Sequence, residues 1–301
     1  MATAREVRLR IRSVNNIAQV TRALQTISAS RVRRAQQAVQ RTRPYATKAW
    51  QVLLHLAQSA GRGSVHPLLA DRPELRRRLV VLITSDRGLA GAYNTNVIRF
   101  ALEQSRQVEV PTSYVTVGRK GRDILLRRRE DIRAEFSALP AEPTYADASA
   151  IGQLVIDEFL EGRADQVLLV YTDFVNLLRQ VPTMKTLLPL EIEAAEQRVQ
   201  EMEQHEPRPT ASYIYEPGQT ELMDLIIARF TQLQLYQALL ESQASEHAAR
   251  MVAMQNATEN ALDLSGALKL QYNKARQLAI TSDMLDIAGG AEALAQARGG
   301  R

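Results

Sequence analysis

The stretch EHAARMVAMQNATENALDLSGALKLQYNKARQLAITSDMLDIAGGAEAL, residues 246–294, decides the fold of this chain. It holds no proline, only three glycines and almost no aromatic residue. Such a composition is typical of a segment that is helical nearly throughout. Its apolar residues are thinly spread, so the sequence raises the question of what the rest of this helix surface contacts.

The helical pattern extends around this stretch, from about Thr220 to about Ile287. About 65 residues at a rise of 1.5 Å each make a rod of roughly 100 Å, which a domain of ~130 residues cannot cover. An apolar stripe indicates the face of the helix that packs. Its members are Leu222, Ile226, Phe230, Leu233, Tyr236 and Leu240, continued by Ala244, Met251 and Met254.

The beginning of the chain, residues 4–59, is also predicted to be one helix. Its large apolar residues recur at steps of three or four, a spacing that suits packing against another helix. They are Val7, Ile11, Val14, Ile17, Val20, Leu24 and Ile27. Pro44 is expected to kink this helix, and Gly61 and Gly63 are expected to end it. We therefore predict that the two terminal helices form an antiparallel pair.

Between these helices, strand and helix patterns alternate. The run RLVVLIT (78–84) is continuously apolar and rich in β-branched residues, which is typical of a strand buried on both faces. Further strands are expected at SYVTVG (113–118), IRAEFSAL (132–139), DQVLLVYTDF (165–174) and, at an edge, RQVPTMKTLLPL. Helices are expected at about 94–106, from RDILLRRR onward, and at 145–162, ended by Gly162. The alternation predicts a small α/β domain with a largely parallel sheet.

The predicted fold class is therefore α/β: a long antiparallel coiled coil of N- and C-terminal helices plus a small Rossmann-like α/β domain. Prolines and a glycine mark the linker that leaves the α/β domain, namely Pro207, Pro209, Pro217 and Gly218. The expected parts are an N-terminal coiled-coil helix (1–60), the α/β domain (75–190), an acidic linker segment (191–219) and a long C-terminal helix (220–301).

The composition excludes several classes of function. With no cysteine, the chain has no disulfide, no thiol nucleophile and no thiolate metal site. Its four histidines are scattered and form no HxxxH or HExxH pair, so no metal site is predicted. No run of 18 apolar residues exists, so we expect no membrane-spanning helix.

The charge is distributed unevenly along the chain. The formal net charge is +5, yet residues 1–50 carry eleven Arg or Lys and a single acid, Glu6. Residues 191–206 carry six Glu against Arg198 alone. The basic end is compatible with nucleic-acid binding, with a targeting peptide or with an acidic protein surface. Because the basic pattern continues past residue 40 without a break, we interpret it as part of the mature fold.

One alternative is an α/β enzyme that uses the loop TSDRGLAGAYN after the first strand. Gly88 and Gly91 are suited to bring backbone N–H groups close to an anion there. The loop lacks both GxGxxG and GxxxxGK[ST], and VGRKGRD is equally unspecific. Asp86 and Asp173 each follow a strand and are candidate general bases, but no second carboxylate or histidine supports them. This alternative predicts phosphate or nucleotide binding at the loop.

A second alternative is a basic coiled-coil protein that binds nucleic acid. Arg31, Arg33 and Arg34 suit phosphates electrostatically. The same helix offers Tyr45 and Trp50 as stacking platforms, but both lie beyond the basic cluster. No helix-turn-helix or other recognised module is present, so we favour a solvated or partner-facing basic helix.

Several motifs together carry a more specific signal. They are REVRLRIRSVNNIAQVTRALQTISASRVRRAQ with RPYA, TSDRGLAGAYNTN, QVPTMKTLLPL, YIYEP, and SEHAARMVAMQNATENA with LQYNKARQLAITSDMLDIAGGA. In this order they resemble the γ subunits of F-type ATP synthases over essentially the whole chain. Family members commonly have Cys where Ala90 stands and Glu where Asp283 stands. The chain also lacks the cysteine pair of plant-type members, which removes thiol regulation of that kind.

The resemblance implies a function. The two terminal helices would form a central rotor shaft that couples ion-driven rotation of the membrane c ring to ATP synthesis or hydrolysis at the β subunits. The chain itself would be non-catalytic, with no cofactor, metal, nucleic acid or small-molecule substrate. Its partners would be the α and β subunits of the catalytic hexamer, the ε subunit and the c ring. It would lie peripherally at the cytoplasmic face of a bacterial plasma membrane.

The resemblance also implies contact residues. Those expected at a β-subunit loop near the tip of the shaft are Arg276, Gln277, Arg250 and Thr281. Those expected at an acidic β-subunit loop are Arg31, Arg33 and Arg34. Those expected in a foot segment near ε and the c ring are Tyr213, Tyr215 and Glu216. The tip, around 257–266 and 280–290, is expected to be small and polar, because large apolar anchors would hinder sliding.

Overall fold

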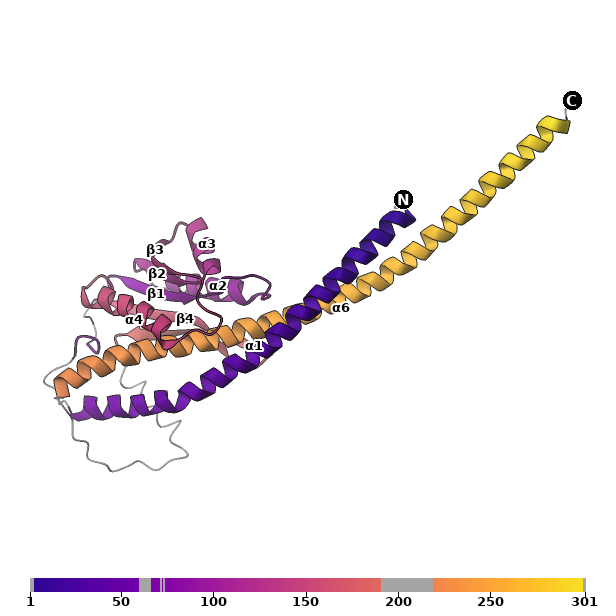
Figure 1. Cartoon of the computed structure of the whole chain (residues 1–301). Helices are drawn as coiled ribbons and strands as arrows, with labels where there is room; N and C mark the ends of the chain where they lie inside the picture. Colours follow the sequence, from indigo (N-terminus) through magenta and orange to yellow (C-terminus); the bar gives the residue numbers. More distant parts are fainter. Residues whose placement is uncertain (1–2, 60–65, 71, 73, 191–218, 300–301) are drawn as a thin grey trace. The chain divides into compact units, whose positions relative to one another are not determined.

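The computed structural model describes residues 3–59, 66–70, 72, 74–190 and 219–299 (Figure 1). By its internal contacts the chain divides into two compact units. The first, here called the helix-pair unit, comprises Met1–Ile27 and Met251–Arg301. The second, here called the sheet unit, comprises Ser28–Arg250. Each of the two long terminal helices contributes residues to both units.

The sheet unit is built on a five-stranded sheet of order β3-β2-β1-β4-β5. The strands are β1 (Arg78–Ile83), β2 (Thr112–Val117), β3 (Asp131–Phe136), β4 (Gln166–Phe174) and β5 (Gln180–Leu188). The first four are parallel, and β5 pairs antiparallel with β4 at the edge. Every residue of β1 is buried, as its continuous apolar run predicts. All five strand predictions are confirmed.

Helices cover both faces of this sheet. On one face lie α2 (Tyr93–Arg106) and α3 (Arg119–Arg127), and on the other lie α4 (Tyr145–Leu160) and part of α6 (Figure 1). The alternation of side chains along β1 divides the core between the two faces. Leu79 and Val81 pack toward α4 and α6, while Val80 and Leu82 pack toward α2. The result is a doubly wound α/β domain, so the predicted fold class is confirmed.

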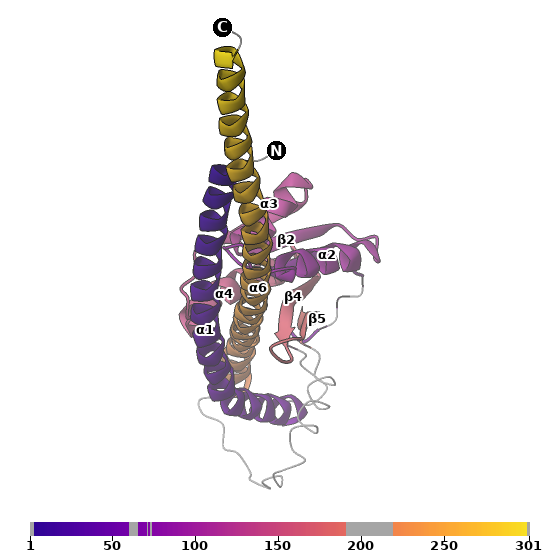
Figure 2. The same cartoon turned by 90° about the vertical axis from the view of Figure 1, so that its right-hand side faces the viewer.

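The last helix, α6 (Gln219–Gly299), is buried on nearly every side in its sheet-unit part, residues 225–250. Phe230, Leu233 and Leu240 are buried, as the apolar stripe predicts. Leu235 and Leu239 are buried as well, although they lie off the stripe. The reason is that this part of α6 packs against α1 on one side and against the sheet and α4 on the other (Figure 2).

Helix α1 (Ala4–Ser59) is continuous, as predicted. Its sheet-unit part runs antiparallel to α6, because residues 31–41 lie beside 236–243 and residues 45–52 lie beside 225–233. The helix bends in this part of the chain, which contains Pro44 (Figure 2). A proline removes one backbone hydrogen bond and clashes with the preceding turn, so a bend near it is expected.

The helix-pair unit is also antiparallel, but its contact face differs from the prediction. The hydroxyls of Thr21 and Thr258 are 2.7 Å apart, and the Ser265 hydroxyl donates to the Asn15 side chain at 2.7 Å. Ala18 lies buried on the same seam. The predicted stripe is wrong for three of its members, Ile17, Val20 and Ile27, which are at least half exposed. Small side chains in this part of the seam let the two backbones approach closely, so these three residues face outward, whereas Val7 of the predicted stripe is buried.

The described residues include the C-terminal end of α6, but not the glycines after α1 or the linker. Helix α6 continues to Gly299, in agreement with the predicted C-terminal helix (220–301), and passes through Gly289 and Gly290 without interruption. The glycines predicted to end α1 and the linker residues 191–218 lie outside the described residues. In the parts of the chain that the structure describes, no helix is both long and apolar enough to cross a membrane.

Candidate functional site

The final part of α6 exposes its whole circumference. The seam register places Ala4, at the start of α1, opposite about residue 276 of α6, so no described segment of the chain pairs with the helix beyond that point. Arg276, Gln277 and Thr281 are exposed here, and the Thr281 hydroxyl donates to the Gln277 carbonyl at 2.9 Å. The structure therefore brings these three predicted contact residues together on one free helix end.

This helix end is not as small and polar as the sequence-based expectation states. Five large apolar side chains on it are more than half exposed. They are Leu278, Ile280, Met284, Leu285 and Ile287. The expectation is therefore wrong for the 280–290 part of the tip. Apolar surface of this extent on a free helix is a common mark of an interaction site.

The three arginines predicted on α1 have different surroundings. Arg33 is exposed, and Arg31 is partly buried. Arg34 forms an ion pair with Glu142 at 3.2 Å, with both side chains more than 60% exposed. A pair this exposed contributes only ~0–1 kcal/mol, so it is readily exchanged for another acidic partner. Arg31 and Arg34 line one cavity of the sheet unit, whereas Arg33 does not.

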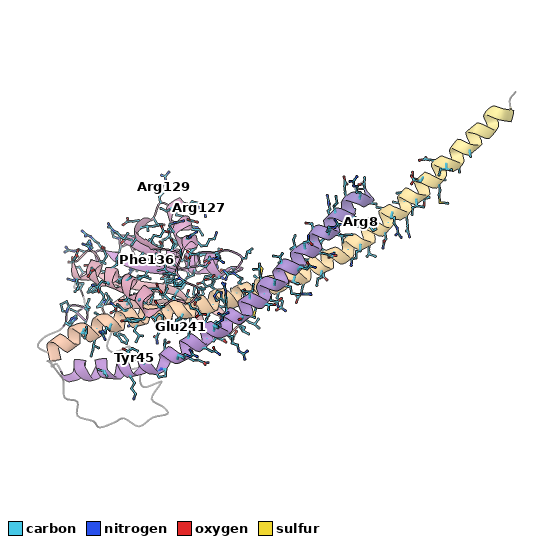
Figure 3. All side chains as sticks on the ribbon, viewed as in Figure 1. Arg8, Tyr45, Arg127, Arg129, Phe136 and Glu241 are labelled. Carbon is cyan, nitrogen blue, oxygen red and sulfur yellow. The ribbon has the colours of Figure 1, made fainter. Side chains whose placement is uncertain are left out.

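Unlike the exposed residues Arg276 and Gln277, Arg250 is buried. It lies on α6 nine residues after Glu241, which Figure 3 labels. Its guanidinium donates twice to the Gly88 carbonyl, at 3.4 and 3.3 Å, and pairs with Glu246 one turn earlier on α6. Burial raises the pKa of Glu246, and Arg250 opposes that rise. Burial and the nearby cations lower the pKa of His247 to about 4, so this imidazole is neutral at pH 7.

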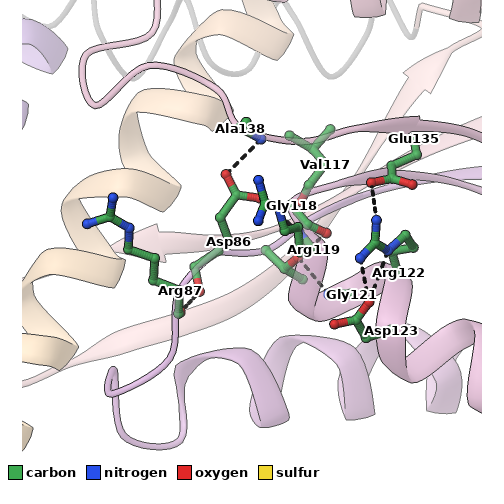
Figure 4. Close-up of polar contacts among 12 residues, drawn as sticks. Asp86, Arg87, Val117, Gly118, Arg119, Gly121, Arg122, Asp123, Glu135 and Ala138 are labelled. Carbon is green, nitrogen blue, oxygen red and sulfur yellow. Dashed lines mark hydrogen bonds and ion pairs between the residues drawn. The ribbon is translucent and has the colours of Figure 1, made fainter.

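The loop after β1, the candidate phosphate site, is held by bonds within the chain (Figure 4). The Asp86 carboxylate accepts from the backbone N–H groups of Arg119 and Ala138, at 3.0 and 2.9 Å. The Asn94 side chain accepts from the backbone N–H of Ser85 at 3.0 Å. These contacts give Asp86 a structural role, since its oxygens are already committed to the loops that follow β2 and β3.

The crevice at the carboxyl ends of β1 and β2 is small, with a volume of about 80 Å³. Open α/β sheets commonly bind ligands in such a crevice. Here α6 reaches into it: the hydroxyls of Tyr93 and Ser242 are 2.6 Å apart, and Glu246 lines the same space. The sequence alone gave no sign that the helix at the far end of the chain fills this place.

The remaining sequence-based candidates lie elsewhere in the chain. Asp173 lies at the end of β4, near the buried carboxyl of Glu241 on α6, whose pKa is raised chiefly by burial. Tyr213, Tyr215 and Glu216 lie outside the described residues. Among the residues that the structure describes, no group of three or more His, Cys, Asp or Glu is arranged to hold a metal ion.

Comparison with known proteins decides the family. The sequence profile described as ATP synthase matches residues 3–294. The ATP synthase gamma chain of Roseiflexus castenholzii is 44% identical, over 98% of this chain and 100% of the relative. That of Dehalococcoides mccartyi strain CBDB1 is 43% identical with the same coverage. The chain belongs to the ATP synthase gamma-chain family.

Solved structures agree with this family assignment. The central stalk and c-ring structure of the Tetrahymena thermophila mitochondrial ATP synthase contains a chain with a TM-score of 0.61 and 25% identity, covering 79% of this chain and 99% of that chain. A chain of the Euglena gracilis mitochondrial ATP synthase rotor gives a TM-score of 0.63 at 20% identity, covering 92% and 98%. The similarity to the Euglena gracilis rotor chain supports the gamma-chain fold.

The family gives the chain its role. A member of the gamma-chain family is the rotor-shaft subunit of an ATP synthase, so this chain is a subunit of an enzyme complex. The resemblance inferred from the sequence motifs is thereby confirmed. The individual contact residues predicted for the gamma chain stay predictions.

Proposed function

We propose that the chain transmits torque between the c ring and the catalytic hexamer of alternating α and β subunits, with the ε subunit bound at its foot. The observation that carries this proposal is the free end of α6, which exposes polar and large apolar side chains around its whole circumference. A helix with so much uncovered apolar surface is expected to have partners.

The coupling rests on differential contact. A shaft changes the affinity of a β-subunit site only if its contact free energy differs between the conformations of that subunit. The helix pair meets this requirement because its faces are unlike. Large apolar side chains such as Ile17 and Val20 face outward on α1, while basic residues flank them. Rotation would therefore present a different chemical surface to each β subunit in turn.

We place the main tip contact at Arg276 and Gln277, with Thr281 beside them, against a loop of the β subunit. The support is their joint exposure on the free end of α6. Arg33 and Arg34 are proposed to meet an acidic β-subunit loop, with Arg31 behind them. This proposal is supported by the exposure of Arg33 and Arg34 and by the weakness of the exposed ion pair that holds Arg34.

Arg250 is grouped with these contacts by the sequence, but only about a tenth of its side chain is exposed. We therefore assign it the role of holding α6 against the Gly88 loop. Tyr213, Tyr215 and Glu216 are proposed to contact ε and the c ring, on the resemblance of their segment to the family alone. The whole subunit would then lie peripherally at the cytoplasmic face of a bacterial plasma membrane.

We further propose that the chain performs no catalytic step. The crevice at the carboxyl ends of β1 and β2 has a volume of only about 80 Å³, and α6 side chains line it. Asp86 and Glu246 add carboxylates there, which disfavour a phosphate. The chemistry of ATP synthesis would therefore take place on the β subunits, with this chain supplying the mechanical coupling.

The test is ATP synthesis in membrane vesicles that carry the assembled complex with Arg276→Ala. We expect the rate to fall about fivefold, as loss of a contact worth ~1 kcal/mol gives, while the complex still assembles. Lys274→Ala is the matched control, because Lys274 is an exposed cation two residues away on the same helix. Equal rates for wild type and Arg276→Ala would remove Arg276 from the proposed interface.

A further inference from the structure

A cavity lined by charged residues lies in the sheet unit beside the β1 crevice, with which it shares Pro143 and Gln243. Its volume is about 580 Å³, within the range of small-molecule sites. Three elements enclose it: α1, the loop that leads into α4, and α6. Arg31 and Arg34 line it and are also proposed to contact a β-subunit loop, but that contact does not account for the concave space itself.

One end of the cavity is strongly basic. Arg31 and Arg34 line it from adjacent turns of α1, and Arg41 lines the cavity two turns farther along the helix. Arg31 opposes the rise in the pKa of the buried Glu246 carboxyl, and Arg34 pairs with Glu142. Both members of that pair are mostly exposed, so the pair holds Arg34 only weakly. The cavity therefore offers fixed positive charge that an anion can compensate.

The other end of the cavity is aromatic. The rings of Tyr145 and Tyr236 meet edge to face with centroids 6.2 Å apart, and the Tyr145 hydroxyl donates to the Gln232 side chain at 2.8 Å. Because α1 and α6 run antiparallel, Tyr236 lies toward Arg41, while Gln243 lies toward Arg31. A planar ring of a ligand can stack here, because tyrosine rings and a guanidinium both stack on π systems.

We propose that this cavity binds a nucleotide, with its phosphates at Arg31 and Arg34 and its base beside Tyr145 and Tyr236. Bidentate guanidinium bonds are the strongest phosphate contacts that a side chain provides. An acidic peptide would satisfy the arginines but would leave the tyrosine end unexplained.

The test is calorimetric titration of the purified full chain, free of the other subunits, with ADP, with ATP and with inorganic pyrophosphate. We expect saturable binding of both nucleotides and weaker binding of pyrophosphate, which lacks the ring. Arg34→Gln should weaken nucleotide binding about tenfold, as loss of a charged phosphate contact gives. Arg33→Gln is the matched control and should leave nucleotide binding by the isolated chain unchanged, because Arg33 is exposed and lies outside the cavity.

A second variant separates the two ends of the cavity. Tyr145→Leu should weaken ADP binding while leaving pyrophosphate binding unchanged, and circular dichroism reports whether the variant folds. The proposal is overturned if ATP at about 5 mM produces no binding heat. It is also overturned if Arg33→Gln and Arg34→Gln weaken binding equally, since that result indicates diffuse attraction to a basic helix. These outcomes are independent of the torque proposal, because the titration contains neither ring.

Discussion

The two parts of helix α6 bury their side chains to very different extents. In the sheet unit, residues 225–250 are buried on almost every face, by α1, by α4 and by the sheet. In the helix-pair unit, the buried residues of the helix reduce to one narrow seam. Its members are Met254, Thr258, Ala261, Ser265 and Leu268. Beyond Leu268 no described residue of α6 is buried.

This difference separates the surface that maintains the fold from the surface that serves partners. Burial on all sides fixes the sheet-unit part of α6, because every large side chain there is surrounded by other side chains of the chain. The helix-pair part has a narrow seam in which small and hydroxyl-bearing residues lie between Met254 and Leu268, and most of its larger apolar residues lie outside this seam. A substitution in one part should therefore change folding stability, and a similar substitution in the other should change assembly.

The largest expected contrast comes from truncating apolar side chains. Phe230→Ala should lower the free energy of unfolding of the sheet unit by about 3–5 kcal/mol, since Phe230 is almost fully buried and its removal leaves a cavity. Ile287→Ala, at a residue that is 73% exposed, should change it by less than about 0.5 kcal/mol. Chemical denaturation followed by circular dichroism measures both. Similar losses for the two variants would contradict the division of α6 into a buried and an exposed part.

A smaller effect is expected from pH. The pKa of His247 is about 4 in the folded chain and about 6.5 when unfolded, so the unfolded state binds more protons between these values. His247 therefore contributes stability at pH 7 that is lost as the pH falls from about 6.5 to about 4, up to about 3 kcal/mol.

The measurement is the difference in unfolding free energy between wild type and His247→Gln at pH 7.5 and at pH 4.5. The wild type should lose its advantage at the lower pH. The raised pKa of Glu246 has the opposite sign, because the folded state then holds the proton more tightly, but it is present in both proteins and largely cancels. A difference that does not change with pH would show that His247 is not held neutral.

The smallest expected effects come from replacing two helical glycines by alanine, which should change the stability in opposite directions. A Cβ at Gly152 would lie 2.6 Å from the Gln232 side chain, because α4 and α6 approach closely there. Gly152→Ala should therefore destabilise the sheet unit by about 1–3 kcal/mol. Gly266 has open space around it, so Gly266→Ala should stabilise its helix by up to about 1 kcal/mol. Thermal unfolding gives both signs, and a gain for Gly152→Ala would mean that the two helices are less closely packed.

Much of the local structure was predictable because it depends on short-range patterns. The apolar run at 78–84 becomes β1, and the turn glycines after it precede α2. The absence of proline from 246–294 allows a helix of that length. In contrast, the helix periodicity predicted the wrong contact face for part of α1. Periodicity shows where large apolar residues lie on a helix, but it does not show whether they pack against this chain or against a partner.

The candidate site divides in the same way. Motif resemblance located the tip residues Arg276 and Gln277, which the structure leaves exposed on α6. It gave no means to tell that Arg250, close by in the same stretch, turns inward to Gly88. Nor did any local pattern join Arg34 to Tyr145 and Tyr236 around one cavity. Such groupings depend on chain segments that are far apart in sequence.

The sequence by itself determined the elements, the α/β class, the long terminal helices and the gamma-chain family, since each follows from local periodicity or from ordered motifs. Only the tertiary structure decided which surfaces are buried. Burial is set by the side chains that neighbouring elements supply, and the same helix pattern packs outward or inward according to them. In this chain α6 fills the β1 crevice in one part and leaves its apolar residues free in the other.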